Sequence, residues 1–156
     1  ELEFAHENHL ETEVVPGISS ALAVPAGQGI PLTMRHVSES FWVITGTTKM
    51  HQLSSDISIA AQSTATVVIL MGMGKLNEIV HVFSKAGKEN TPVAIIQNGS
   101  TTREQSGYGT IDTIEVVVAE QQLSSPAIIV IGEVVENRVT LNSISKDVNQ
   151  YVLSQN

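Results

Sequence analysis

Four short runs of almost uninterrupted apolar residues constrain the fold of this 156-residue chain more than any other feature. They cover Phe41–Thr45, Thr66–Met71, Pro92–Gln97 and Ala127–Ile131, and a glycine or an Asn-Gly pair follows each run. A strand with no polar alternation needs apolar cover on both of its faces. Apolar residues recur at helical spacing between residues 75 and 86, and a helix there would provide such cover. The pattern predicts an α/β fold: a mixed, largely parallel sheet with helices on both faces.

Weaker patterns occupy the segments between these runs. Further strands are expected at Thr12–Val15, Gln105–Thr110 and Val139–Leu141. Further helices are expected over residues 2–10, 18–27, 57–61, 112–122 and 145–153. Asp112 stands three residues before Glu115, which resembles a capping box and predicts that the 112–122 helix begins there.

The segment from Pro16 to Pro31 has an unusual composition for a helix. Gly, Ala and Ser occupy the positions where a core helix would carry Leu, Ile or Phe. Ser19 and Ser20 would place hydroxyls and backbone N–H groups at its start, an arrangement that suits a polar or carboxylate-bearing ligand. Tight packing of the helix against a sheet explains the small residues equally well. Spacing alone does not choose between ligand approach and close packing.

Charge and composition restrict the partners of the chain. It has 16 acidic and 8 basic residues, a net charge of −8, and its Lys and Arg residues are scattered singly. A nucleic-acid partner is not expected, because phosphate backbones are bound by clustered cations. No apolar run reaches the roughly 18 residues of a membrane span, and no signal-peptide pattern opens the sequence. A cytoplasmic protein without a membrane partner is predicted.

Motifs for covalent or metal catalysis are incomplete in this sequence. The Gly72–Lys75 stretch lacks the spacing of both a dinucleotide fingerprint and a P-loop. His6–His9 has one residue too few between Glu and the second His for a metalloprotease motif. Gly17–Ala21 lacks the final glycine of a nucleophile elbow, and the chain has no cysteine. No metal site is predicted, and the motifs that remain indicate ligand binding rather than covalent catalysis.

Small, loop-forming residues follow the expected strands. Ligands of open α/β sheets bind beyond the carboxyl ends of the strands. A ligand crevice is therefore expected among the segments at those ends, which are Pro16–Ser20, Gly46–Thr47, Met71–Met73, Asn98–Ser100 and Gly132–Glu133.

Several of these segments together resemble one known family. The residues that carry the likeness are Val14–Ala21, Gly29–Arg35, Leu70–Met73, Gln97–Ser100 and Ser125–Val135. In this order they resemble the tetrapyrrole methylase family, and most closely the members that methylate uroporphyrinogen III. The resemblance implies a homodimeric methyltransferase that converts uroporphyrinogen III to precorrin-2 in sirohaem and cobalamin biosynthesis. S-adenosyl-L-methionine is then the cofactor and S-adenosyl-L-homocysteine the product, held in a cleft between two α/β domains.

The same likeness assigns expected roles to particular residues. Residues expected to contact the cofactor are Ser19, Ser20, Met71, Gly99, Pro126, Ala127 and Ile128, the last three near the adenine. Arg35 is expected to contact the tetrapyrrole substrate, and Arg103 is a second cation for its carboxylates. Met34 stands where the family commonly has histidine, so a substrate contact by that histidine is absent here.

The family's glycine-rich turn and proposed acid/base residues fall upstream of Glu1. The resemblance therefore predicts that residues 1–12 end an interdomain helix and linker. Residues 13–156 would be the C-terminal S-adenosylmethionine-binding domain of a longer protein, with the N-terminal domain absent. No catalytic residue is expected in this chain, which would be inactive alone. Two alternatives stay open: a sibling methylase acting on a later precorrin, which the Met34 departure allows, and a non-catalytic dimerisation or scaffold domain.

Overall fold

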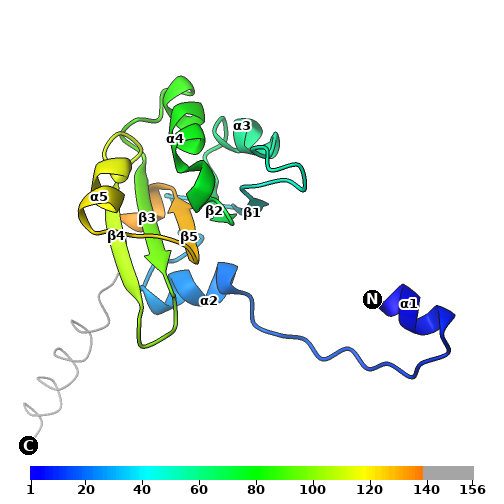
Figure 1. Ribbon diagram of the computed structural model, residues 1–156. Helices are drawn as coiled ribbons and strands as arrows, with labels where there is room; N and C mark the ends of the chain where they lie inside the picture. Colours follow the sequence, from blue (N-terminus) through cyan, green and yellow to red (C-terminus); the bar gives the residue numbers. More distant parts are fainter. Residues whose placement is uncertain (139–156) are drawn as a thin grey trace, which may run out of the picture.

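One mixed five-stranded sheet lies at the centre of the computed structural model, which describes residues 1–138 (Figure 1). Its strands are β1 (Phe41–Thr45), β2 (Thr66–Leu70), β3 (Pro92–Gln97), β4 (Gln105–Thr110) and β5 (Ala127–Ile131). Their spatial order is β1-β2-β5-β3-β4. The predicted mixed α/β class and all four apolar strands are confirmed.

The expected predominance of parallel pairs is wrong. Only β1 and β2 pair in parallel, whereas β5 runs antiparallel to both β2 and β3, and β4 runs antiparallel to β3. The strands β1, β2 and β3 do point the same way, but β5 lies between β2 and β3. Apolar residues on both faces of a strand report that both faces are covered, and they carry no information about the direction of the neighbouring strands.

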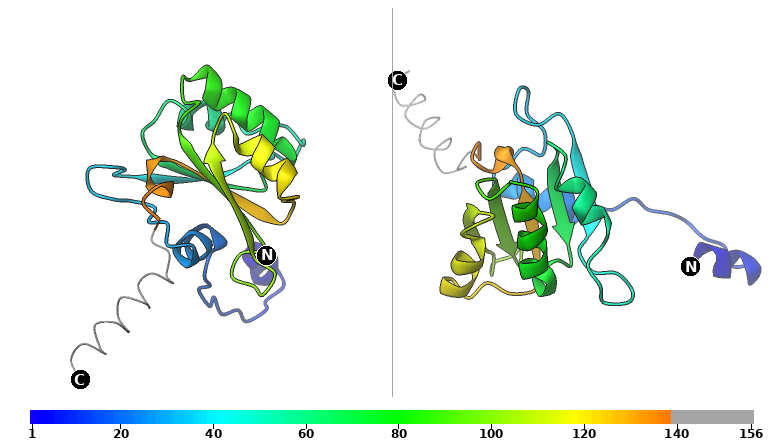
Figure 2. Two further views of the ribbon diagram at one scale, coloured as in Figure 1. Left: turned by 90° about the vertical axis from the view of Figure 1, so that its left-hand side faces the viewer. Right: turned by 90° about the horizontal axis from the view of Figure 1, so that it is seen from above.

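Helices cover both faces of the sheet, as predicted. Figure 2 shows α2 (Ser20–Gly27) on one side, with α4 (Leu76–Lys85) and α5 (Ile114–Glu120) on the other. The short helix α3 (Asp56–Ala60) packs with α4 and β1, and the turns η1 (Met73–Lys75) and η2 (Glu133–Val135) follow β2 and β5. The remaining helix, α1 (Leu2–Glu7), stands apart from the sheet at the end of an extended arm (Figure 1).

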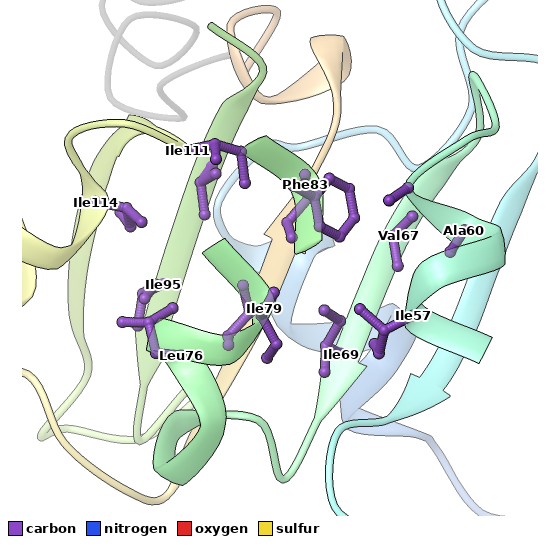
Figure 3. Close-up of a cluster of buried hydrophobic side chains, with 14 of the residues drawn as sticks. Ile57, Ala60, Val67, Ile69, Leu76, Ile79, Phe83, Ile95, Ile111 and Ile114 are labelled. Carbon is purple, nitrogen blue, oxygen red and sulfur yellow. The ribbon is translucent and has the colours of Figure 1, made fainter. Parts of the chain in front are cut away.

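Alternate residues of each central strand enter different cores, as the two-residue period of a strand requires. In β2, Val67 and Ile69 face α3 and α4, where they join the core around Phe83 drawn in Figure 3. Val68, between them, faces α2 and packs in a second core with Ala21. Full burial of such side chains stabilises the fold by about 1.5–3 kcal/mol each, so these strands need both layers of helices.

Three local predictions differ from the structure. The segment Thr12–Val15 is extended but pairs with no strand among residues 1–138, and a strand requires a partner for its backbone groups. The strand β1 was expected to be buried, yet Val43 is 48% exposed because β1 is an edge strand. The capping box at Asp112 is absent: α5 begins after Thr113, whose hydroxyl accepts a hydrogen bond from the Thr110 N–H at 2.9 Å.

Two predicted elements, the strand Val139–Leu141 and the helix over residues 145–153, lie outside the described residues. The division into residues 1–12 and 13–156 stays a prediction. Within residues 1–138, no helix has the length and apolar character needed to cross a bilayer.

The carboxyl ends of β1 and β2 meet at a close contact between two glycine backbones. A Cβ built on Gly46 would lie 2.6 Å from the Cα of Gly72, closer than real Cβ atoms approach backbone. The Gly46 N–H donates to the Leu70 carbonyl at 2.7 Å, and the Thr47 hydroxyl donates to the Met71 carbonyl at 3.0 Å. These contacts hold the residues after β2 in place.

We expect Gly46→Ala to destabilise the fold by roughly 1–3 kcal/mol, because the new methyl group must push the two backbone segments apart. Urea denaturation measures this change in the free energy of unfolding. The matched control is Gly74→Ala, since a Cβ at Gly74 meets nothing within 4 Å. That variant is expected to stay within about 0.5 kcal/mol of the unaltered chain. Equal stability of the two variants would contradict the close contact.

Candidate functional site

The carboxyl ends of β2 and β3 lie beside the amino end of β5, on one side of the sheet where these strands end. Leu70 pairs with Ile128, and Gln97 pairs with Ala127. Because β5 is antiparallel to both neighbours, its first residues stand beside the last residues of β2 and β3. Its last residues are at the opposite side, so the expectation that Gly132–Glu133 joins the crevice is wrong.

A cleft of about 650 Å³ opens at this side, between the strand ends and α2. We call it the strand-end cleft. Its lining consists of Ser20, Val24, Leu70, Met71, Ile96, Asn98, Gly99, Thr101, Arg103, Pro126, Ala127 and Ile128. All of the predicted cofactor contacts except Ser19 are therefore brought together in one cavity, from segments far apart in the sequence. Its volume is in the range of small-molecule sites, roughly 300–1,000 Å³.

Ser19 and Arg35 do not line the strand-end cleft. The Ser19 hydroxyl caps α2 by accepting a hydrogen bond from the Ala21 N–H at 3.2 Å, an N-cap interaction that positions Ser20. Arg35 lies in a separate hollow of about 350 Å³, formed by the exposed loop around Met34 and His36.

Several residues of the cleft wall are not among those expected from the sequence, chiefly Val24, Leu70, Ile96 and Thr101. Ile96 could have been expected, because it belongs to the apolar run that ends directly before Asn98 and the expected crevice. Val24 was hidden among the small residues of α2. Its side chain packs against Gly99, where a Cβ would lie 2.6 Å from Val24 Cγ2. Only glycine at position 99 permits this contact between the loop and the helix.

Two lining residues have left-handed backbone conformations at equivalent positions. Met71 follows β2 with φ of 54°, and Asn98 follows β3 with φ of 51°. Asparagine adopts this conformation readily, but a bulky side chain such as methionine rarely does. Met71 is also 66% exposed, so no burial of its side chain compensates for the strain. Such strain concentrates at functional sites.

Hydrogen bonds join the loop over residues 98–104 to Gln28, the C-cap residue of α2, which in turn is bonded to Tyr108 of β4. The Gln28 side-chain amide donates to Glu104 Oε1 at 2.5 Å, and the Tyr108 hydroxyl donates to Gln28 Oε1 at 2.5 Å. The other oxygen of Glu104 accepts from the Ser100 N–H at 2.6 Å. The Asn98 N–H also donates to the Pro126 carbonyl at 3.0 Å. The loop is therefore preorganised over the cleft.

The chemistry of the cleft is that of binding and orientation. Val24, Ile96 and Ile128 supply apolar walls suited to a flat ring system, while the loop supplies main-chain and hydroxyl groups. No cysteine, histidine or lysine belongs to its lining within residues 1–138. The cleft therefore presents no strong nucleophile to a bound molecule.

Comparisons with known proteins agree with this arrangement. A family model described as Tetrapyrrole (Corrin/Porphyrin) Methylases matches residues 1–115. The chain is 37% identical over 131 residues to the uroporphyrinogen-III C-methyltransferase of Methanocaldococcus jannaschii, covering 83% of this chain and 54% of that protein. It is 37% identical over 142 residues to the siroheme synthase of Methylobacillus flagellatus, covering 90% of this chain and 30% of that protein.

Among solved structures, the chain resembles the uroporphyrin-III C-methyl transferase of Thermus thermophilus complexed with S-adenyl homocysteine. The TM-score is 0.69 and the identity 28%, over 86% of this chain and 58% of that chain. The present chain thus spans about half the length, or less, of the proteins it matches.

The strained backbone at Met71 leads to a prediction about the stability of two variants. We expect Met71→Gly to unfold with a free energy about 1 kcal/mol higher than Met71→Ala, because only glycine adopts positive φ without steric cost. Both variants remove the thioether, so thermal or urea denaturation isolates the backbone term. At Met50, which is 77% exposed and free of positive φ, alanine should be at least as stable as glycine. The same order at both positions would contradict the strain.

Proposed function

Because the chain belongs to the tetrapyrrole methylase family, we propose that it takes part in the S-adenosyl-L-methionine-dependent C-methylation of uroporphyrinogen III. The product is precorrin-2, an intermediate of sirohaem and cobalamin biosynthesis. The names of the relatives support this substrate, since one is a uroporphyrinogen-III C-methyltransferase and another a siroheme synthase. The match covers 54% of the first relative.

The observation that carries the proposal is the convergence of Ser20, Met71, Gly99 and Pro126–Ile128 on the strand-end cleft. Its apolar walls fit an adenine ring, and main-chain groups beside Asn98 and Gly99 offer donors and acceptors for the ring edge. S-adenosyl-L-homocysteine, the product of methyl transfer, would occupy the same cleft. The Thermus thermophilus relative is complexed with that molecule.

The bound cofactor supplies an electrophilic methyl group. The residues of this chain would hold the adenosine, exclude water with Val24 and Ile128, and orient the donor toward the substrate. Methyl transfer depends on alignment of the reacting atoms, and correct orientation can contribute about 7–11 kcal/mol to lowering a barrier. We assign no catalytic residue to residues 1–138, and Ser19 acts on the cofactor through Ser20.

Arg35 is the proposed substrate contact outside the cleft. It lies on an exposed loop in a hollow separate from the cofactor residues, where its charge would attract the carboxylates of a tetrapyrrole. We further propose that the protein acts as a homodimer in the cytoplasm, without a nucleic-acid or membrane partner. The net charge of −8 supports the exclusion of nucleic acid.

A chimaera tests the activity. Replacing the matching part of the Methanocaldococcus jannaschii relative with this chain should give an enzyme that adds two methyl groups to uroporphyrinogen III, measured by mass spectrometry. The unaltered relative is the positive control. A folded chimaera that methylates only a later precorrin would replace the proposal with the sibling activity. A folded dimer that neither binds the cofactor nor methylates any precorrin would establish the scaffold alternative.

Calorimetry of the chain with S-adenosyl-L-homocysteine tests the cofactor site directly. Met71→Ala should weaken binding roughly tenfold, because about 1.5 kcal/mol of apolar burial against the ligand is lost. Met50→Ala serves as the control, since Met50 is exposed and does not line the cleft. Unchanged affinity in Met71→Ala would remove Met71 from the binding site.

A further inference from the structure

Arg103 is the one residue with a charged side chain among those that line the strand-end cleft in residues 1–138. The rest of the lining is apolar, amide or hydroxyl in character. The chain as a whole carries a net charge of −8, which repels anions. A single cation at the cleft therefore decides where a negatively charged group of a ligand can be placed.

The guanidinium of Arg103 is available for such a group. Within residues 1–138 the structure contains one ion pair, between Lys75 and Glu78, and it records no hydrogen bond from the Arg103 side chain. Only the backbone of Arg103 is engaged, with its N–H donating to the Thr101 hydroxyl at 3.2 Å and its carbonyl accepting from the Asn98 amide.

The neighbouring carboxylate, Glu104, forms no ion pair with Arg103 in the described part of the chain. Both oxygens of Glu104 are already engaged, one by the Gln28 amide at 2.5 Å and the other by the Ser100 N–H at 2.6 Å. The bond to Gln28 ties the loop to the C-cap of α2, a helix that supplies Ser20 and Val24 to the cleft wall. Glu104 therefore serves to position the loop, and Arg103, the residue before it, is held at the cleft with an unpaired charge.

We propose that Arg103 binds a carboxylate of the molecule that occupies the strand-end cleft. This inference rests on the proposed function, whose ligands offer two sources of that group: the amino-acid end of the cofactor and the acid side chains of the tetrapyrrole. Arginine suits both, because its planar fork pairs with a carboxylate through two parallel hydrogen bonds. Arg103 thus orients a ligand whose ring system is held by the apolar walls.

Calorimetry with two cofactor-like probes tests the first source. S-adenosyl-L-homocysteine carries the amino-acid carboxylate, and methylthioadenosine lacks it. Arg103→Gln should weaken binding of the first roughly tenfold and leave binding of the second unchanged, since only the first loses a charge-assisted hydrogen bond. Arg103→Lys should restore part of the loss. The control is Lys85→Gln on α4, which makes the same change in net charge on the other face of the sheet.

Uroporphyrin, the stable oxidised form of the substrate, tests the second source. Weaker binding of uroporphyrin alone by Arg103→Gln would assign the carboxylate to the tetrapyrrole. Unchanged affinity for both uroporphyrin and S-adenosyl-L-homocysteine would overturn the inference and leave the proposed function intact. Failure of the unaltered chain to bind any of the three probes would count against the inference and the proposed cofactor site together.

Discussion

The antiparallel insertion of β5 between β2 and β3 is the constraint on which the rest of the structure depends. Its backbone hydrogen bonds complete the sheet at its most buried position, where Ile129 and Val130 are fully buried. The same pairing sets the register that places Ala127 beside Gln97 and Ile128 beside Leu70. A parallel strand in this place would have brought Gly132 to the cleft. The direction of one strand therefore decides which residues form the site.

Backbone strain at the cleft is accompanied by contacts that hold the strained residue in place. Met71 holds an exposed thioether at positive φ, and its carbonyl is fixed by the Thr47 hydroxyl. Gly72, the next residue, lies in close contact with Gly46, so the segments that follow β1 and β2 stay together. A strained residue persists only where its surroundings fix its conformation more strongly than the strain opposes it. Several backbone contacts thus fix the strand ends that bear the cleft, which suits a site whose task is to orient a ligand.

Particular residues show how far sequence reasoning reached. The apolar runs predicted β2, β3 and β5, because a short continuous apolar run bounded by turn residues is typical of a strand buried on both faces. The family likeness named Met71, Gly99 and Pro126, and these lie in one cleft. The small residues of α2 left two interpretations open. The structure shows the packing of this helix, since Ala21 and Val24 contact the sheet. The approach of a ligand to Ser20 is part of the proposed function.

The sequence by itself determined the two-sided burial of the central strands β2, β3 and β5, because the apolar pattern is a property of the chain alone. It also determined the acidic charge and the family. Only the tertiary structure decided strand direction, the exposure of β1 as an edge, and the separation of Arg35 from the cleft. It alone revealed the Glu104–Gln28–Tyr108 bonds beside Arg103. Those features depend on contacts between residues as many as 80 positions apart, which no local pattern encodes.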